Sequence, residues 1–152
     1  MKKLFLTVCI IVLISATGCH NINQREKQKE ESTSLSKSAV LEGRAGSTVY
    51  FAFDSFVLSD KAKSTLNRQA VYMRAHPDKK FLIEGNTDNR GTREYNLGLG
   101  ERRANSAKNY LLSRGISERK IIVTSNGKEK PHVVGNNEFA WSHNRRTVTI
   151  KK

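Results

Sequence analysis

Apolar residues recur along the chain in short runs and stripes that predict an alternation of strands and helices. Residues 48–53, T-V-Y-F-A-F, are β-branched, aromatic or small, which is typical of a strand. Ser59 can cap a helix that runs to about residue 75, before Pro77. This helix would bury one apolar stripe, whose members recur at spacings of four, four and three: Ala62, Leu66, Ala70 and Met73.

A second strand and a longer helix follow Pro77. Residues 80–85 alternate, with Phe81 and Ile83 on one side, as in a strand with one buried face. The pattern then predicts a helix over about residues 93–114, which Gly115 ends in a position that favours a left-handed residue. The inner side of this helix is expected to carry Leu97, Ala104, Ala107 and Leu111.

The last part of the chain adds a turn, a strand, a loop, one helical turn and a final strand. These elements are expected at residues 117–120, 121–125, 128–137, 138–142 and 147–151. Pro131 and Gly135 break the loop, and the final T-V-T-I-K alternates as a strand does. The order β-α-β-α-β-β predicts an α/β (α+β) sandwich, in which two main helices pack on one face of a mixed sheet.

The N-terminal part of the chain has a different pattern. Lys2 and Lys3 precede an apolar run, residues 4–14, which is short for a membrane span and typical of an export signal. The run ends in S-A-T-G-C, which resembles the lipobox of bacterial lipoproteins. In that motif the thiol, here of Cys19, is acylated and cleavage makes the cysteine the new N-terminus. The alternatives are an ordinary signal peptide with a free thiol, or an uncleaved anchor.

This interpretation divides the chain into three parts. Residues 1–18 are a lipoprotein signal peptide, residues 19–46 a flexible tether, and residues 47–152 a folded domain. The tether is polar and mixed in charge, with almost nothing to bury. Cys9 would be removed with the signal, so the mature chain has one cysteine, Cys19, and no internal disulfide.

The net charge suggests an acidic partner. The 152 residues carry a formal charge of +13, and removal of the signal leaves +11, because it takes away two lysines and no acid. Such a field attracts nucleic acid, anionic lipid or another acidic polymer. The export signal argues against nucleic acid, and the sequence has no stacked-aromatic RNA-binding motif.

Motifs for catalysis are not evident in the sequence. There is no zinc-ligand spacing among the histidines and no G-x-S-x-G elbow, and acylation of Cys19 would remove the last thiol nucleophile. Carboxylates could be paired for glycoside cleavage, but nothing singles out an acid with a raised pKa. We therefore expect no enzyme activity, no catalytic residues, no metal site and no cofactor.

The loop E-G-N-T-D-N-R-G-T, residues 84–92, carries a run of polar side chains directly before the second predicted helix. Its Asp88 precedes a helix N-terminus, and Arg103 lies on that helix. Asp88 and Arg103 together can hold a zwitterion, the carboxylate taking an ammonium and the guanidinium a carboxylate. Alternatively, Asp88 caps the helix while Arg102 and Arg103 are solvated. Spacing alone leaves both interpretations open.

The motif G-N-T-D-N-R-G-T-x-E-Y-N-L-x-L-G-E-R-R-A-N resembles that of the OmpA-like peptidoglycan-binding domain family. The match extends through F-A-F-D, Y-L-L-S-R-G, S-N-G-K-E-K-P and N-R-R-T-V, and so covers nearly all of residues 48–150. Two departures are Arg93, where the family commonly has proline, and Asn126, where it commonly has tyrosine.

The resemblance implies non-covalent binding of the peptidoglycan stem peptide, through its meso-diaminopimelate side chain. That side chain ends in a free amino-acid head group, which suits the zwitterion site. The residues that match the family's binding positions are Asp88, Arg103, Phe53, Asp54, Arg90, Thr92 and Leu99. Arg102 would belong to the surface, and alanine at Asp88 or Arg103 would abolish binding to sacculi and leave the fold intact.

The resemblance also implies a cellular setting. The lipid on Cys19 would sit in the outer membrane and the domain would hold the cell wall from the periplasm. TolB and the other Tol proteins would be its partners, in outer-membrane integrity and invagination at division. The alternative is a wall-anchoring lipoprotein of another envelope assembly, such as a secretion or conjugation system.

Overall fold

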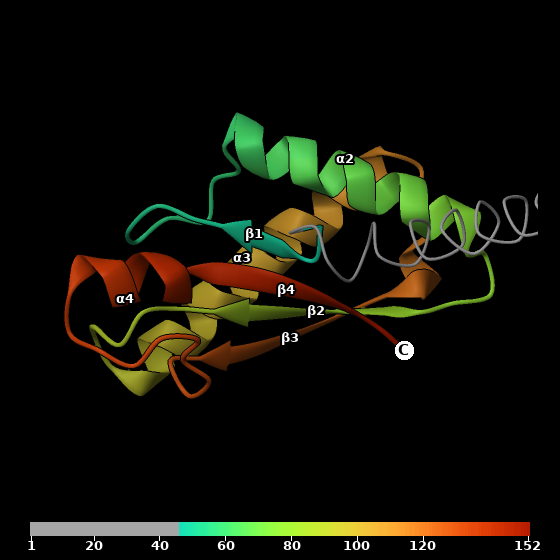
Figure 1. Ribbon diagram of the computed structural model, residues 1–152. Coiled ribbons are helices and arrows are strands. Elements are labelled where there is room, and N and C mark those ends of the chain that lie inside the picture. Colours follow the sequence, from blue (N-terminus) through green and yellow to red (C-terminus); the bar gives the residue numbers. More distant parts are fainter. Residues whose placement is uncertain (1–45) are drawn as a thin grey trace, which may run out of the picture. The chain divides into compact units, whose positions relative to one another are not determined.

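In the computed structural model, which describes residues 46–152, three helices and a four-stranded sheet follow the expected order (Figure 1). The elements are β1 (Thr48–Tyr50), α2 (Asp60–Ala75), β2 (Phe81–Asn86), α3 (Arg93–Ser113), β3 (Ile121–Gly127), α4 (Glu138–Asn144) and β4 (Arg146–Lys151), with a short 3-10 helix at Glu118–Lys120. The signal peptide, the lipidation site at Cys19 and all of the tether except Gly46 lie outside the described residues, so that division of the chain stays a prediction.

The sheet is mixed and has the strand order β1-β4-β2-β3. β4 runs antiparallel to both of its neighbours, whereas β2 and β3 are parallel. α2 packs on β1 and α3, and α3 packs on β2 and β3, so the two long helices cover one face, as predicted (Figure 1). Among residues 46–152 no helix combines the length and the apolar composition that crossing a bilayer requires.

Helix α2 forms as the sequence predicts. The Ser59 hydroxyl accepts a hydrogen bond from the amide of Ala62 at 3.2 Å, which caps the first turn. The helix ends at Ala75, before Pro77. All members of the predicted stripe are buried: Ala62, Leu66, Ala70 and Met73.

Helix α3 lies against the sheet with its backbone. A Cβ atom on Gly85 of β2 would lie 1.8 Å from the carbonyl oxygen of Gly100 of α3. Any side chain at position 85 would therefore push α3 away from the sheet, and the close approach requires glycine there. Gly115, with φ +82°, follows the helix as expected. Leu97 is only partly buried, unlike Ala104, Ala107 and Leu111 on the same predicted face.

Strand β1 is shorter than the sequence suggests. It was predicted over residues 48–53 but ends at Tyr50, although the amide of Phe51 still donates to the carbonyl of Arg145 at 2.9 Å. The chain then turns, with Asp54 in the left-handed region at φ +49°. Residues 51–53, which were predicted as strand, therefore lie outside β1, and Phe53 and Asp54 lie in the turn that follows it.

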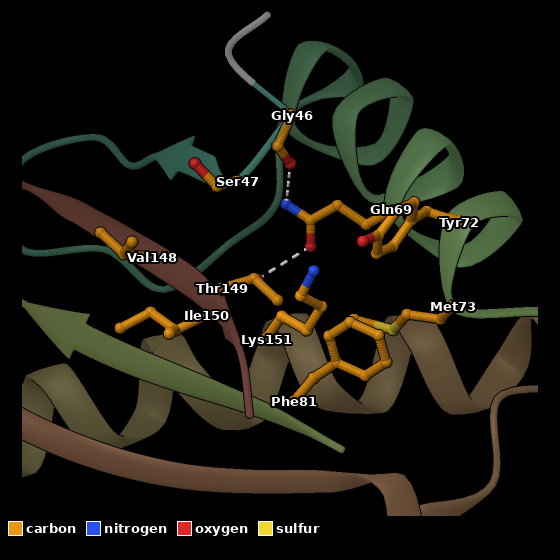
Figure 2. Close-up of a pocket in the computed structure, with 10 residues that line it drawn as sticks. All are labelled: Gly46, Ser47, Gln69, Tyr72, Met73, Phe81, Val148, Thr149, Ile150 and Lys151. Carbon is orange, nitrogen blue, oxygen red and sulfur yellow. Dashed lines mark hydrogen bonds between the residues drawn. The ribbon is translucent and has the colours of Figure 1, made fainter. Parts of the chain in front are cut away.

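The N-terminal end of β1 is fixed by Gln69 of α2, which is 2% exposed. Its amide donates to the carbonyl of Gly46, and its carbonyl oxygen accepts from the Thr149 hydroxyl at 2.9 Å (Figure 2). The amide of Thr149 donates to the carbonyl of Ser47 at 2.7 Å. A cavity of about 380 Å³ adjoins this contact, and its wall includes Met73. These bonds join the start of β1 to α2 and β4.

Candidate functional site

A cavity of about 160 Å³ lies where the turn after β1 meets the loop between β2 and α3. Its lining is formed by Phe53, Asp54, Asp88, Arg90, Gly91, Tyr95, Asn96, Leu99 and Arg103. The structure therefore brings together six of the seven residues predicted for the binding site. The seventh, Thr92, lies outside the lining, and its hydroxyl accepts from the amide of Tyr95 at 3.2 Å as the N-cap of α3.

Asp88 is a buried carboxylate held by arginines. It is 5% exposed, and it accepts hydrogen bonds from the Arg90 amide at 3.2 Å and from Arg90 Nη2 at 2.5 Å. Arg145 Nη1 lies 3.6 Å from Asp88 Oδ2. Burial by itself raises the pKa of Asp88, but the bonds from Arg90 and the charges of Arg90 and Arg145 outweigh it and keep the pKa below its usual range. Asp88 is thus ionised, and it does not cap α3, because Thr92 does.

Arg103 is fully buried and donates to three backbone carbonyls. Nε reaches Ser55 O at 2.8 Å, Nη1 reaches Asn86 O at 3.0 Å, and Nη2 reaches Ala52 O at 3.0 Å. Burial lowers the pKa of Arg103 to about 10, which still leaves it charged at neutral pH. A guanidinium has five N–H groups, so these three bonds leave two of them unused. The interpretation of Arg103 as a solvated surface residue is therefore wrong.

The adjacent Arg102 behaves as the surface residue that the sequence suggests. It is exposed, and its guanidinium lies 5.8 Å from the ring centroids of both Phe56 and Tyr95. The two arginines of the E-R-R-A motif thus lie on different faces of α3: Arg103 lines the cavity, and Arg102 lies on the exposed face.

Arg90 lies between two aromatic rings. Its guanidinium carbon is 4.0 Å from the ring centroid of Phe53 and 4.1 Å from that of Trp141 in α4. Trp141 Nε1 donates to Asn89 Oδ1 at 2.8 Å, so α4 is tied to the same loop. Sequence reasoning missed Trp141. The one available signal was that it is the only tryptophan of the chain.

Arg145 is a second residue that sequence reasoning missed. Its Nε donates to Phe51 O at 3.2 Å and its Nη2 to Glu138 Oε1 at 2.6 Å, which lowers the pKa of Glu138. Nη1 has no hydrogen-bond partner, although the side chain is only 8% exposed. N-R-R-T-V marked this stretch as family-like, but only the sheet order brings it beside Asp88.

The rim of the cavity is partly apolar. Leu99 is 5% exposed, whereas Phe53 is 59% exposed. The Tyr95 hydroxyl donates to Asp54 Oδ1, which raises the pKa of Tyr95. Two carboxylates, of Asp54 and Asp88, and two guanidinium groups, of Arg90 and Arg103, thus line one small cavity, and such an arrangement can bind a ligand that carries both signs of charge.

The two departures from the family motif lie beside the cavity and do not line it. Arg93 is exposed and pairs with Glu129, Nε to Oε1, at 3.2 Å. Asn126 Nδ2 donates to Glu84 Oε2 and to Asn86 Oδ1, each at 3.2 Å. Neither substitution changes a residue that lines the cavity.

Comparisons with known proteins identify the family. The OmpA family model matches residues 50–145, and the chain therefore belongs to the OmpA family. Relatives that it matches at 39 to 48% identity include peptidoglycan-associated lipoproteins. That of Haemophilus influenzae is 48% identical over 101 residues, 66% of each chain, and that of Buchnera aphidicola is 39% identical over 131 residues, 84% of this chain and 76% of the relative.

Solved structures show the same fold. The crystal structure of the peptidoglycan-associated lipoprotein from Burkholderia pseudomallei superposes with a TM-score of 0.68 at 40% identity, over 70% of this chain and 90% of that one. The C-terminal domain of Helicobacter pylori MotB superposes with a TM-score of 0.65 at 17% identity, over 69% and 83% of the two chains. At that identity the second likeness shows the fold alone.

The burial of Arg103 predicts a structural cost for its removal. Arg103→Ala would leave the carbonyls of Ala52, Ser55 and Asn86 without their donor, and we expect the free energy of unfolding to fall by about 3 kcal/mol or more. Urea denaturation followed by circular dichroism measures this. Arg102→Ala is the matched control, with an expected change below about 0.5 kcal/mol. Equal stability of the two variants would contradict the structural role of Arg103.

Proposed function

We propose that this protein binds peptidoglycan non-covalently, through the diaminopimelate-containing stem peptide, at the cavity around Asp88. The observation that carries the proposal is the buried, ionised Asp88 beside guanidinium groups in one cavity of about 160 Å³. The free end of diaminopimelate carries an ammonium and a carboxylate on one carbon. A site with one buried carboxylate and excess positive charge matches both groups.

Each charge of the ligand has a partner available. A carboxylate offers about four lone-pair sites and Arg90 takes two on Asp88, so Asp88 can also accept from the ligand ammonium. The N–H groups of Arg103 that the three carbonyl bonds leave unused are donors for the ligand carboxylate, and Arg145, with Nη1 3.6 Å from Asp88 Oδ2, adds positive charge behind Asp88. Phe53 and Leu99 offer apolar contact to the methylene groups between the two ends of diaminopimelate.

Three of the predicted residues have indirect roles in this proposal. Asp54 accepts from Tyr95 and so fixes the rim, Arg90 holds the carboxylate of Asp88, and Thr92 caps the helix that carries Leu99 and Arg103. No step of the proposed function is a chemical reaction. Binding alone would couple the protein to the cell wall.

In the proposed setting, the lipid on Cys19 holds the protein in the outer membrane and the domain faces the periplasm. The protein would act in the Tol-Pal system, with TolB and the other Tol proteins as partners, to maintain outer-membrane integrity and to aid invagination at division. The family membership and the names of the lipoprotein relatives support this setting.

The proposed ligand contact is tested with Asp88→Asn. This change keeps the side-chain volume and removes the charge that an ammonium requires, so we expect at least about a tenfold loss of co-sedimentation with purified diaminopimelate-type sacculi. Glu94→Gln, at an exposed acid on the first turn of α3, is the matched control and should bind as the parent does. Unchanged binding by Asp88→Asn would refute the site.

The ligand itself is tested by competition. A stem tripeptide with diaminopimelate should displace the protein from sacculi. A tripeptide with lysine should not, because the lysine side chain ends in an amine without the carboxylate.

Binding to sacculi should be equal at pH 7 and pH 5. The pKa of Asp88 in the folded protein lies below the ordinary value near 3.9, so Asp88 is ionised at both pH values. Its charge, and with it the binding, is lost only when the pH falls below that ordinary value.

The anchor is tested with Cys19→Ser. Without the thiol there is nothing to acylate, and we expect the protein to leave the membrane fraction for the soluble fraction after cell breakage. Cys9→Ser changes a cysteine inside the predicted signal and should leave the protein in the membrane fraction. Membrane attachment of Cys19→Ser would contradict the lipobox.

The partner is tested by affinity capture of the tagged, full-length protein from detergent-solubilised envelopes. Recovery of TolB is the expected result, and the same capture with Asp88→Asn tests whether recovery depends on the cavity around Asp88. Recovery of the components of a secretion or conjugation complex, without TolB, would contradict membership of the Tol-Pal system.

A further inference from the structure

Strand β1 lies at one edge of the sheet that residues 46–152 form. It pairs only with β4, in the register Thr48↔Val148, Val49↔Thr147. Flanking bonds join Thr149 N to Ser47 O and Phe51 N to Arg145 O. Because hydrogen-bonded positions alternate in an antiparallel ladder, the N–H and C=O groups of Thr48 and Tyr50 point away from β4. Within residues 46–152 they have no hydrogen-bond partner.

A groove of about 640 Å³ runs along this free edge. Its floor includes Thr48 and Tyr50, and α2 forms a wall through Lys61, Ser64 and Arg68, which lie on one side of the helix because their spacings are three and four. The volume is within the range of sites that bind small ligands and short peptides. The groove is distinct from the cavity around Asp88, whose lining shares no residue with it.

The groove is basic. Lys61 and Arg68 are among its lining residues, and none of the lining residues carries a carboxylate. Arg68 donates only to hydroxyl groups, Nη1 to Ser64 Oγ at 3.1 Å and Nη2 to Thr65 Oγ1 at 2.9 Å, so its charge is not neutralised there. A second copy of the chain would bring the same charge, because the chain carries +13, and the edge is thereby protected from self-pairing.

We propose that this groove binds an extended, acidic segment of a partner protein, which adds to the sheet as a fifth strand beside β1. The two N–H and two C=O groups of Thr48 and Tyr50 supply main-chain hydrogen bonds, and acidic side chains of the segment face Lys61 and Arg68. Backbone pairing favours a polypeptide over other anionic polymers, because only a polypeptide offers both donors and acceptors at strand spacing.

The test uses the full-length protein in detergent and a fluorescent nine-residue peptide of alternating glutamate and threonine. Binding is followed by fluorescence anisotropy, and we expect amide hydrogen exchange at Thr48 and Tyr50 to slow by about tenfold or more in the complex. Lys61→Glu with Arg68→Glu should weaken binding by about tenfold or more, since two attractions become repulsions.

Lys63→Glu with Arg74→Glu is the matched control, on the same helix with the same charge change but outside the groove. It should alter affinity by less than about threefold. Asp88→Asn should bind the peptide normally, which separates this proposal from wall binding. An equal loss in both double variants would overturn the groove assignment. Equal binding of a peptide with alternate N-methylated amides, or unchanged exchange at Thr48 and Tyr50, would overturn strand addition.

Discussion

The buried guanidinium of Arg103 is the interaction on which the site depends. It donates to carbonyls of Ala52 and Ser55 in the turn after β1 and of Asn86 at the end of β2. A buried charge is costly unless hydrogen bonds stabilise it, so these segments are held where the three carbonyls can reach the guanidinium. The same contact fixes Phe53 and Asp54 at the mouth of the cavity. Arg103 therefore both positions the residues at the mouth of the cavity and contributes a positive charge to its lining.

The second constraint is the balance of charge around Asp88. A carboxylate that is 5% exposed remains ionised because Arg90 bonds to it and Arg145 lies close to it. The charges of the site are thus already in place in the structure without a ligand. Arg90 is itself held between Phe53 and Trp141, so the geometry of the carboxylate depends on the aromatic rings of two distant segments.

The elements and most of the site were predictable from the sequence. The stripe of α2, the cap at Ser59 and the end of α3 at Gly115 depend on residues within a few positions of one another, and all are confirmed. Trp141 and Arg145 were not predictable in this way. They reach the loop at Asn89 and Asp88 only because β4 inserts between β1 and β2 in the sheet.

The sequence by itself determined the alternation of strands and helices, because periodicity and capping act between neighbouring residues. It also indicated that Asp88 and Arg103 belong together, through a family motif. Only the tertiary structure decided what each does there. Thr92, and not Asp88, caps α3, and the hydrogen bonds of Arg103 reach carbonyls 17, 48 and 51 positions away. Bonds over such separations form only when packing brings the segments together, and local patterns carry no information about them.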